Sequence, residues 1–563
     1  MKHDYEPWKF LDEYRGKVFH GQWPTLPEVF GITASRFPDR WVFSCFDPTD
    51  MRFTYREAEA RVKSLSSYLV GLGVKKGDKI GLTGKNSPEW ALSYLSILYA
   101  GGIVVPLDYQ LKTEEMQGLM DMAEVKILFV DEEKYDFFAG QKKHEHMISL
   151  SPAKPNYVLD IPEHPWVDRE MPEETDLAAI LFTSGTTGVA KGVMLTHQNF
   201  ISDCYLAQAN MNIYHTDVFY ALLPLHHSYA MLAIFIESIS VGAEVIFAKR
   251  VVVPQMLKDF KKGNVTMFLS IPMLFNKIIK ALMKGIREKG IVVYGIVRFL
   301  MSISGLIKKV TGVNPGKKMF KGILAKVSLD NNRICICGGG PLPSSTFKLF
   351  NQLGIDFVQG YGLTETSPII ALNPKHHYKE ASVGKYIPQA DFKIADPDEE
   401  GNGEILVKGP MVMQGYYKNE EATAASFTED GYLKTGDAGH LDSEGYLYLT
   451  GRKKNLIVTE GGKNVFPEEI EDKFQLVEEI NQILVKGYVE DAKTKAERIE
   501  AFIYPEEEWA KGKTPDEIRE RLEAIIAQVN KELRSYQKIE RLKVLEEPME
   551  VGGTLKIKRY KVE

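Results

Sequence analysis

The chain is poor in cysteine, in unbroken apolar stretches and in excess positive charge. Its four cysteines, Cys45, Cys204, Cys335 and Cys337, are too few and too scattered for a disulfide framework, and we expect them to be reduced and buried. The net charge of −6 argues against a general affinity for nucleic acids. The N-terminal segment MKHDYEPWKFLDEYRGKVF lacks the apolar core of a signal peptide. These absences favour a cytoplasmic protein.

The sequence also lacks a convincing membrane span, which takes ~20 apolar residues. Residues 230–248 are largely apolar, but Glu237 and Glu244 interrupt them. Residues 291–307 are apolar too, yet this stretch is short and contains Arg298. We therefore expect no transmembrane helix.

The chain is long and rich in short apolar runs. With 563 residues it is too long for one hydrophobic core, so two or more domains are expected. Over residues 1–390, helical patterns alternate with runs typical of buried strands: DKIGLTG, GIVVPL, KILFVD, AAILFTSG, DVFYALLP, AEVIFA, TMFLSIP and ICICGGG. This alternation predicts α/β subdomains with parallel sheets, whose ligands bind at the carboxyl ends of the strands.

The pattern changes from Asp391 onward. The short, glycine-punctuated strands DFKIAD, GEILVKG, GYLKTGD and GYLYLTG predict a small β-barrel-like subdomain over residues 391–452, which completes a large N-terminal domain, 1–452. After Arg452, the strands ILVKGYV and RIEAFIY and the helix PDEIRERLEAIIAQVNKEL predict a smaller α+β domain over residues 453–563.

Residues 275–326 are unusually basic. They hold twelve lysines and arginines against a single acid, Glu288, with an apolar, helix-like stretch in the middle. A basic surface with apolar residues suits an anionic membrane face or an amphipathic anion, and would place the protein peripherally at the inner face of a membrane. An ordinary solvated insertion explains the same composition equally well, so both interpretations stay open.

One stretch, LFTSGTTGVAKGVMLTH at residues 181–197, concentrates residue types that hold phosphate. Glycines free the backbone to wrap an anion, hydroxyls donate hydrogen bonds, and Lys191 supplies positive charge. The stretch is not a Walker loop, which requires G-x-x-x-x-G-K-[ST]. Here Ala190 precedes the lysine and Gly192 follows it.

The segment TSGTTGVAKG resembles the phosphate loop of the adenylate-forming superfamily, which includes acyl-CoA synthetases, firefly luciferase and peptide-synthetase adenylation domains. Other segments resemble that family's further motifs, in the family's order: LPLHHSYA, GGGPLP, QGYGLTETSP, GYLKTGDAG, GRKKNLIV and GGTLKIKRY. One position departs from the pattern, since Ala190 stands where the family commonly has proline. The resemblance implies ATP-dependent, AMP-forming activation of a carboxylic acid.

The resemblance also implies where the nucleotide binds. Thr183 to Lys191 would cradle the β- and γ-phosphates, Thr364 would touch the α-phosphate, Tyr361 would stack on adenine, and Asp437 would accept hydrogen bonds from the ribose hydroxyls. Glu365, together with Thr183, would hold Mg²⁺, a cation that prefers oxygen ligands. The full set of implied ATP and AMP contacts is Thr183, Ser184, Gly185, Thr186, Thr187, Gly188, Lys191, Gly338, Gly339, Gly340, Pro341, Gln359, Gly360, Tyr361, Gly362, Thr364, Asp437 and Arg452.

Three residues make up the implied catalytic set: Lys556, His227 and Glu365. Lys556 would bridge the acid carboxylate and the α-phosphate in the transition state, where negative charges must be brought together. His227 falls on the family's histidine position beside the acyl carboxylate. His226 is expected to pack or to line the pocket.

The second half-reaction in this family transfers the acyl group to CoA after the C-terminal domain rotates, which makes that domain mobile. Lys454 occupies the family's hinge position. Gly461 and Gly462 would let the backbone approach the pantetheine arm, because neither has a side chain.

Two features favour a long-chain fatty acid as the substrate, with ATP and CoA. The basic insertion resembles that of long-chain acyl-CoA synthetases, and so do TLKIKR and GKNVFPEEIE. The alternatives are a medium-chain or aryl acyl-CoA ligase, a fatty acyl-AMP ligase or acyl-carrier-protein synthetase, and a nucleotide-binding relative without turnover. The sequence leaves the oligomeric state open.

Overall fold

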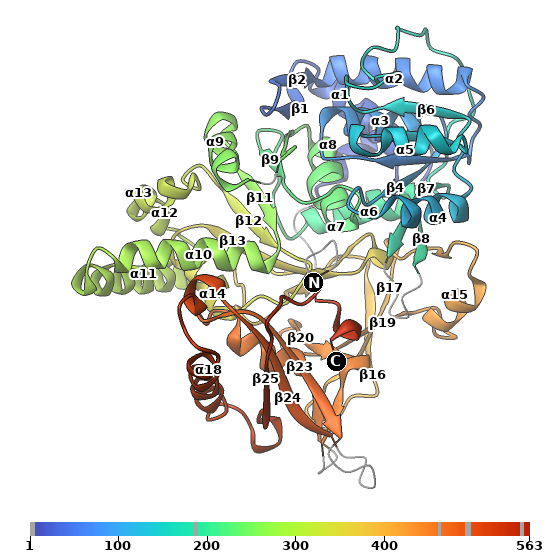
Figure 1. Ribbon diagram of the computed structural model, residues 1–563. Helices are drawn as coiled ribbons and strands as arrows, with labels where there is room; N and C mark the ends of the chain where they lie inside the picture. Colours follow the sequence, from blue (N-terminus) through green and yellow to red (C-terminus); the bar gives the residue numbers. More distant parts are fainter. Residues whose placement is uncertain are drawn as a thin grey trace.

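The computed structural model describes residues 6–183, 190–250, 252–459, 463–489, 497–551 and 557–562. Two large sheets with their helices form the N-terminal part of the chain, and smaller sheets follow below them in Figure 1. The arrangement confirms the predicted α/β class with a smaller C-terminal unit.

The first large sheet has seven strands in the order β18-β8-β7-β4-β3-β5-β6. Its strands are β3 (Lys79–Thr83), β4 (Ile103–Leu107), β5 (Ile127–Val130), β6 (His146–Ser149), β7 (Leu177–Thr183), β8 (Lys191–Thr196) and β18 (Gly415–Tyr416). The strands from β7 to β6 run parallel, whereas β8 and β18 pair antiparallel at one edge. Each apolar run predicted here is a strand.

The helices in residues 26–208 begin where the sequence supplies caps. Thr25 and Thr54 form capping boxes with Glu28 and Glu57, and Ser87 caps the helix predicted after DKIGLTG. The helices are α1 (Leu26–Arg36), α2 (Tyr55–Gly71), α3 (Pro88–Tyr99), α4 (Thr113–Ala123), α5 (Glu132–Gln141) and α6 (His197–Gln208).

The second large sheet has nine strands in the order β15-β14-β13-β12-β11-β9-β10-β1-β2. They are β1 (Trp41–Cys45), β2 (Met51–Thr54), β9 (Val218–Ala221), β10 (Glu244–Phe247), β11 (Met267–Ser270), β12 (Ile334–Cys337), β13 (Asp356–Gly362), β14 (Ile369–Leu372) and β15 (Lys385–Tyr386). Strands β9, β11, β12 and β13 are parallel neighbours, so their carboxyl ends lie together. The thiols of Cys335 and Cys337 are free and buried on β12, as expected.

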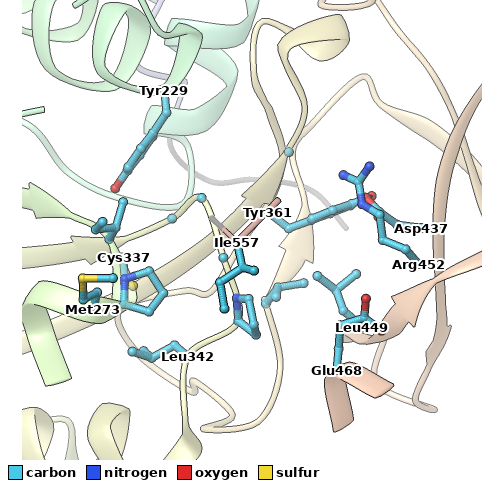
Figure 2. A pocket seen from close by; sticks show the side chains of 18 of the residues that line it. Tyr229, Met273, Cys337, Leu342, Tyr361, Asp437, Leu449, Arg452, Glu468 and Ile557 are labelled. Atoms are coloured by element: carbon cyan, nitrogen blue, oxygen red, sulfur yellow. The ribbon is translucent and has the colours of Figure 1, made fainter. Parts of the chain in front are cut away.

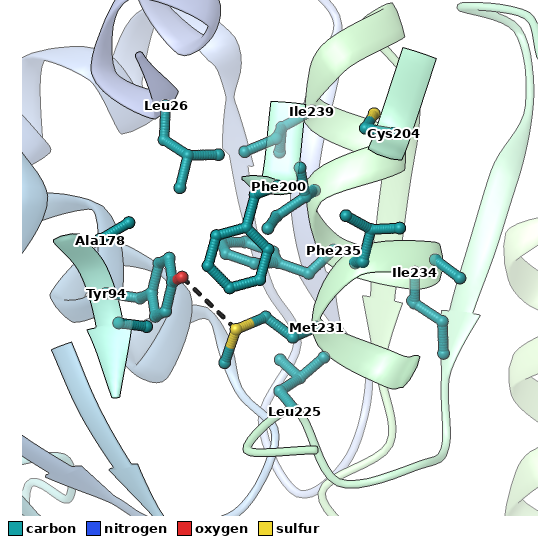
Figure 3. Close-up of a cluster of buried hydrophobic side chains, with 14 of the residues drawn as sticks. Leu26, Tyr94, Ala178, Phe200, Cys204, Leu225, Met231, Ile234, Phe235 and Ile239 are labelled. Atoms are coloured by element: carbon teal, nitrogen blue, oxygen red, sulfur yellow. Dashed lines mark hydrogen bonds between the residues drawn. The ribbon is translucent and has the colours of Figure 1, made fainter. Parts of the chain in front are cut away.

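An apolar core joins the two large sheets (Figure 3). Phe200 of α6 packs beside Met231 and Phe235, which belong to a π-helix, η2 (Met231–Ile236), between α7 (Ser228–Ala230) and α8 (Glu237–Val241). The Tyr94 hydroxyl donates to the Met231 sulfur at 3.4 Å. Burying a side chain of this size contributes about 1.5–3 kcal/mol, so this cluster fixes the helix that follows His227.

The small β unit is a four-stranded antiparallel sheet made of β16 (Asp391–Ala395), β17 (Gly403–Lys408), β19 (Leu433–Leu441) and β20 (Leu447–Arg452). Beyond it, β23 (Ile480–Val489), β24 (Glu497–Pro505), β25 (Arg541–Val544), α16 (Pro467–Glu471) and α18 (Pro515–Val529) pack around a separate apolar cluster. The domain boundary near residue 453 stays a prediction.

The basic segment is largely helical. Helix α10 (Pro272–Arg287) is followed by α11 (Ile291–Thr311), and the two lie side by side at the left of Figure 1. Within the described residues, α11 is the one helix long and apolar enough to cross a membrane by length and composition. The expectation that residues 291–307 are too short was wrong, because the helix continues to Thr311.

Candidate active site

A cavity of about 2300 Å³ opens between the carboxyl ends of the large sheets and the C-terminal unit (Figure 2). Every predicted site residue that the structure describes lines it: Thr183, Lys191, His227, Gly338, Gly339, Gly340, Pro341, Gln359, Gly360, Tyr361, Gly362, Thr364, Glu365, Asp437, Arg452 and Lys454. The predicted residues Ser184, Gly185, Thr186, Thr187, Gly188, Gly461, Gly462 and Lys556 lie outside the described residues. The individual roles stay predictions.

Asp437 lies in one wall of the cavity, next to Tyr361 and Arg452 (Figure 2). Strands β19 and β20 pair it directly with Arg452, whose Nε lies 2.8 Å from one carboxylate oxygen. The Tyr361 hydroxyl donates to the other oxygen at 2.8 Å. Burial raises the pKa of Tyr361 well above its usual value, so the hydroxyl keeps its proton. Asp437 is therefore an acceptor that is fixed in position in the cavity wall.

Thr183 and Lys191 face each other at the end of the β7–β8 pair. The Lys191 ammonium lies 4.7 Å from the centre of the Tyr416 ring, and the Tyr416 hydroxyl donates to a Glu365 carboxylate oxygen at 2.9 Å. Tyr416 thus connects the lysine that would hold phosphate to the carboxylate that would hold metal.

The Glu365 and Thr183 side chains offer the oxygen donors that Mg²⁺ prefers. In the described part of the chain, the second Glu365 carboxylate oxygen accepts no hydrogen bond, so it is available to a cation. The Thr183 hydroxyl donates to the Lys191 carbonyl at 3.5 Å, which leaves its oxygen lone pairs for a ligand. The donor set fits the implied ion.

The histidine motif follows β9 and turns back across the cavity. Nε2 of His226 lies 3.1 Å from Nε2 of His227 and 3.6 Å from a carboxylate oxygen of Asp108. Burial, and secondarily His227, lowers the pKa of His226 well below its usual value, so this ring is neutral. The Ser228 hydroxyl lies 3.2 Å from that of Thr364, which ties the histidine motif to the next one.

Asp108, His226 and His227 also bring their ligand atoms within 4.8 Å of one another, close enough for one metal ion to reach all three. His226 lines the cavity, as expected.

Glycines let the strand ends approach their neighbours closely. A Cβ on Gly338 would lie 3.0 Å from the Tyr229 ring, whose hydroxyl donates to the Ile336 carbonyl at 3.1 Å (Figure 2). A Cβ on Gly362 would lie 1.6 Å from the Pro368 carbonyl oxygen, so only glycine fits there.

Three residues of the site region escaped the sequence reasoning: Tyr416 and Glu237, which line the cavity, and Asp108, which lies beside the cavity-lining His226. Asp108 directly follows the run GIVVPL, so its place at the carboxyl end of a strand was the available signal. Glu237 was noticed only as a break in an apolar stretch. It is buried in the cavity wall, accepts a hydrogen bond from Gln208 Nε2 at 2.7 Å, and has its pKa raised to about 8 by burial. Nothing in the sequence around Tyr416 distinguishes it.

The C-terminal unit supplies the facing wall, including Glu468 and Ile557 (Figure 2). Lys454 lies in a 3₁₀ turn, η5 (Lys453–Asn455), directly after β20. Burial lowers the pKa of Lys454, and the nearby Arg452 and Arg559 lower it further. Lys454 therefore sits at the covalent junction between the two walls of the cavity.

Comparison with known proteins gives the family. The model of the family described as "AMP-binding enzyme" matches residues 30–417. This chain belongs to that family. Among curated relatives, this AMP-binding enzyme is 29% identical to Long-chain-fatty-acid–CoA ligase FadD15 of Mycobacterium bovis, over 90% of this chain and 89% of that one. It is 26% identical to the chloroplastic Long-chain-fatty-acid–[acyl-carrier-protein] ligase AEE15 of Arabidopsis thaliana, over 92% and 80%.

Among solved structures, the AMP-binding enzyme resembles the O-succinylbenzoate Coenzyme A Synthetase (MenE) of Bacillus subtilis in complex with ATP and magnesium ion. The TM-score is 0.73 at 24% identity, with 95% of this chain and 98% of that chain covered. This likeness confirms the fold.

Proposed function

We propose that this AMP-binding enzyme joins a long-chain fatty acid to AMP, releasing pyrophosphate, and then transfers the acyl group to CoA. The observation that carries the proposal is the convergence of every described site residue that the motifs predict on one cavity. The relative from Mycobacterium bovis, named for long-chain acids and CoA and matched over 90% of this chain, supports the choice of acid and acceptor.

In the first step a carboxylate oxygen of the acid would attack the α-phosphorus, and the bond from that phosphorus to the pyrophosphate oxygen would break. Asp437, fixed by Tyr361 and Arg452, would hold the ribose and so align the α-phosphate. Lys191 would face the departing pyrophosphate, and His227 and Thr364 would lie near the attacking carboxylate and the α-phosphate. Lys556 would supply the decisive charge in the transition state.

Glu365 and Thr183 would hold Mg²⁺, which neutralises phosphate charge when bound. The relative MenE, which binds ATP and magnesium ion, supports this assignment.

In the second step the CoA thiolate would attack the acyl carbonyl, and the bond to AMP would break. Lys454 would act as the hinge, and Gly461 and Gly462 would border the pantetheine arm. We also propose that the enzyme works in the cytoplasm, at the inner face of a membrane.

The proposal is tested by ATP–pyrophosphate exchange with a series of straight-chain acids from acetate to oleate, together with benzoate. We expect exchange to rise with chain length and to be followed by CoA consumption with the same acids. Exchange confined to short acids or to benzoate would contradict the long-chain substrate. Exchange with long acids, no CoA consumption and acylation of a carrier protein would favour the acceptor named for the Arabidopsis relative. No exchange with any acid would refute adenylation.

A further inference from the structure

Helix α11 is attached to the fold by one narrow face. Met301 and Ser304 are buried, and a Cβ at Gly305 would lie 2.8 Å from a side-chain carbon of α14 (Ser344–Gln352). The Lys308 ammonium is buried and lies 2.7 Å from an Asp356 carboxylate oxygen. Ser304 and Gly305 lie three and four residues after Met301, and Lys308 lies seven residues after it. All four therefore share one side of the helix. The sequence counted Lys308 in the basic surface, and the structure corrects this.

The opposite side of α11 is apolar and exposed. Its large residues recur at alternating intervals of four and three, with exposed fractions that reach 75%: Val292 71%, Ile296 55%, Phe299 66%, Ile303 37%, Leu306 64% and Val310 75%. At 1.5 Å per residue this stripe is about 27 Å long. We call it the outer stripe. Single exposed apolar residues need no explanation, but a continuous stripe marks an interaction surface.

The segments that precede and follow α11 in the chain are basic. Exposed cations lie at the end of α10 and after α11: Lys284, Arg287, Lys289, Lys317, Lys318, Lys321 and Lys326. Lys309, on α11 itself, pairs with Glu380 at 3.3 Å. In a chain with a net charge of −6, this concentration of positive charge is local.

We propose that the outer stripe of α11 docks on an anionic membrane surface, with the helix lying in the plane of the interface. Apolar side chains would enter the acyl boundary, and the flanking lysines and arginines would meet anionic headgroups. The buried Lys308–Asp356 pair argues against a spanning helix, because that side of α11 belongs to the protein core. Pairing of two copies through the stripe would bring the same cations together, which is unfavourable.

Helix α11 packs against α10, which lines the candidate active site. Along α10, Met273, Lys277 and Ala281 line the large cavity, and Ala281 also lines a second cavity of about 190 Å³ that reaches Val293 and Val297 of α11. Docking would hold this wall of the active site against the lipid phase. The docking proposal stands independently of the proposed reaction, since its test measures no turnover.

The test is flotation of the purified full chain with vesicles of phosphatidylcholine alone or mixed with phosphatidylglycerol. We expect flotation with the mixed vesicles only, and weaker flotation at high salt. The pair Phe299→Ser and Leu306→Ser should lower the partition coefficient at least about tenfold. Lys318→Gln and Lys321→Gln, both at exposed residues, should lower it about fivefold per charge. The matched control is Trp166→Ser with Val167→Ser, exposed at 44% and 42% elsewhere on the surface, which should bind like the wild type.

Two control measurements test for unfolding of the variant and for self-association of the protein. Thermal midpoints of the Phe299→Ser/Leu306→Ser variant and the wild type should agree, because both side chains are exposed. Sedimentation velocity reports self-association. Equal flotation with neutral vesicles, or unchanged flotation of that variant, would overturn the proposal. So would a dimer that the same variant dissociates, in a protein that binds no vesicles.

Discussion

At the scale of single residues, Asp437 shows how the site is prepared before a ligand arrives. Its two carboxylate oxygens are held by Tyr361 and Arg452, which come from different sheets. Because both partners are partly or fully buried, the carboxylate has little freedom to rotate. A ribose diol would therefore meet an acceptor already in place.

Removing the Tyr361 hydroxyl tests whether holding Asp437 in position contributes to ATP binding. We expect Tyr361→Phe to raise the KM for ATP about five- to tenfold, with a smaller change in kcat, because the ring remains and about 1–1.5 kcal/mol of hydrogen bonding is lost. The measurement is ATP–pyrophosphate exchange over a range of ATP concentrations. Tyr432→Phe is the matched control, since that hydroxyl also donates to an aspartate, Asp391, at 2.6 Å, outside the cavity. An unchanged KM in Tyr361→Phe would contradict the role.

Glu237 gives a pH prediction with a definite sign. Burial raises its pKa from an ordinary 4.5 to about 8. The folded protein thus keeps a proton that the unfolded chain releases, so the stability from Glu237 is complete below pH 4.5 and is lost as the pH rises to 8. Between these values the free energy of unfolding should fall by about 1.4 kcal/mol per pH unit relative to Glu237→Gln, which holds no titrating proton.

Urea denaturation of the wild type and Glu237→Gln at pH 5, 6.5 and 8 measures this difference. Gln should retain the acceptor oxygen for Gln208, so the variant is expected to fold. The urea midpoint of Glu237→Gln should rise steadily relative to that of the wild type as the pH increases. The exposed substitution Glu421→Gln should show no such trend. A constant difference across the three pH values would mean that Glu237 is ionised in the folded state.

At the scale of elements, the sequence allowed accurate prediction where one physical signal dominates. Parallel strands buried on both faces are apolar runs, so all eight runs predicted in residues 1–390 are strands. The residues after β9, β11, β12 and β13 line the cavity, because the carboxyl ends of these parallel neighbours meet at one edge. Strand order and pairing across the sheets were not predictable, since they depend on contacts between distant segments.

Pairwise contacts explain what the sequence missed at this scale. Lys308 looks like its neighbour Lys309 until Asp356, far along the chain, is brought beside it. Asp108, which follows β4, reaches His226, which follows β9, only because the two large sheets pack against one apolar core. Helix α11 extends past residue 307 to Thr311 and ends at Gly312, whose backbone is in the left-handed region. Residue type alone does not indicate any of these contacts.

At the scale of the whole molecule, the two half-reactions place different demands on one cavity. The walls are contributed by two parts of the chain that are joined at η5, where Lys454 lies. Adenylation requires positive charge at the α-phosphate, whereas thioester formation requires a path for a thiol to the acyl carbonyl. A rotation at this junction would serve both needs with one active site.

Restricting the junction should therefore separate the two steps. Lys454→Pro fixes φ and restricts the preceding residue, so we expect a several-fold larger loss of CoA consumption than of ATP–pyrophosphate exchange. Lys454→Ala removes the side chain but leaves the backbone free, and should affect the two rates alike. Both are measured on the same acid at saturating ATP. Equal losses in Lys454→Pro would show that the junction does not move between the steps. A larger loss of exchange than of CoA consumption would place the limiting motion before adenylation instead.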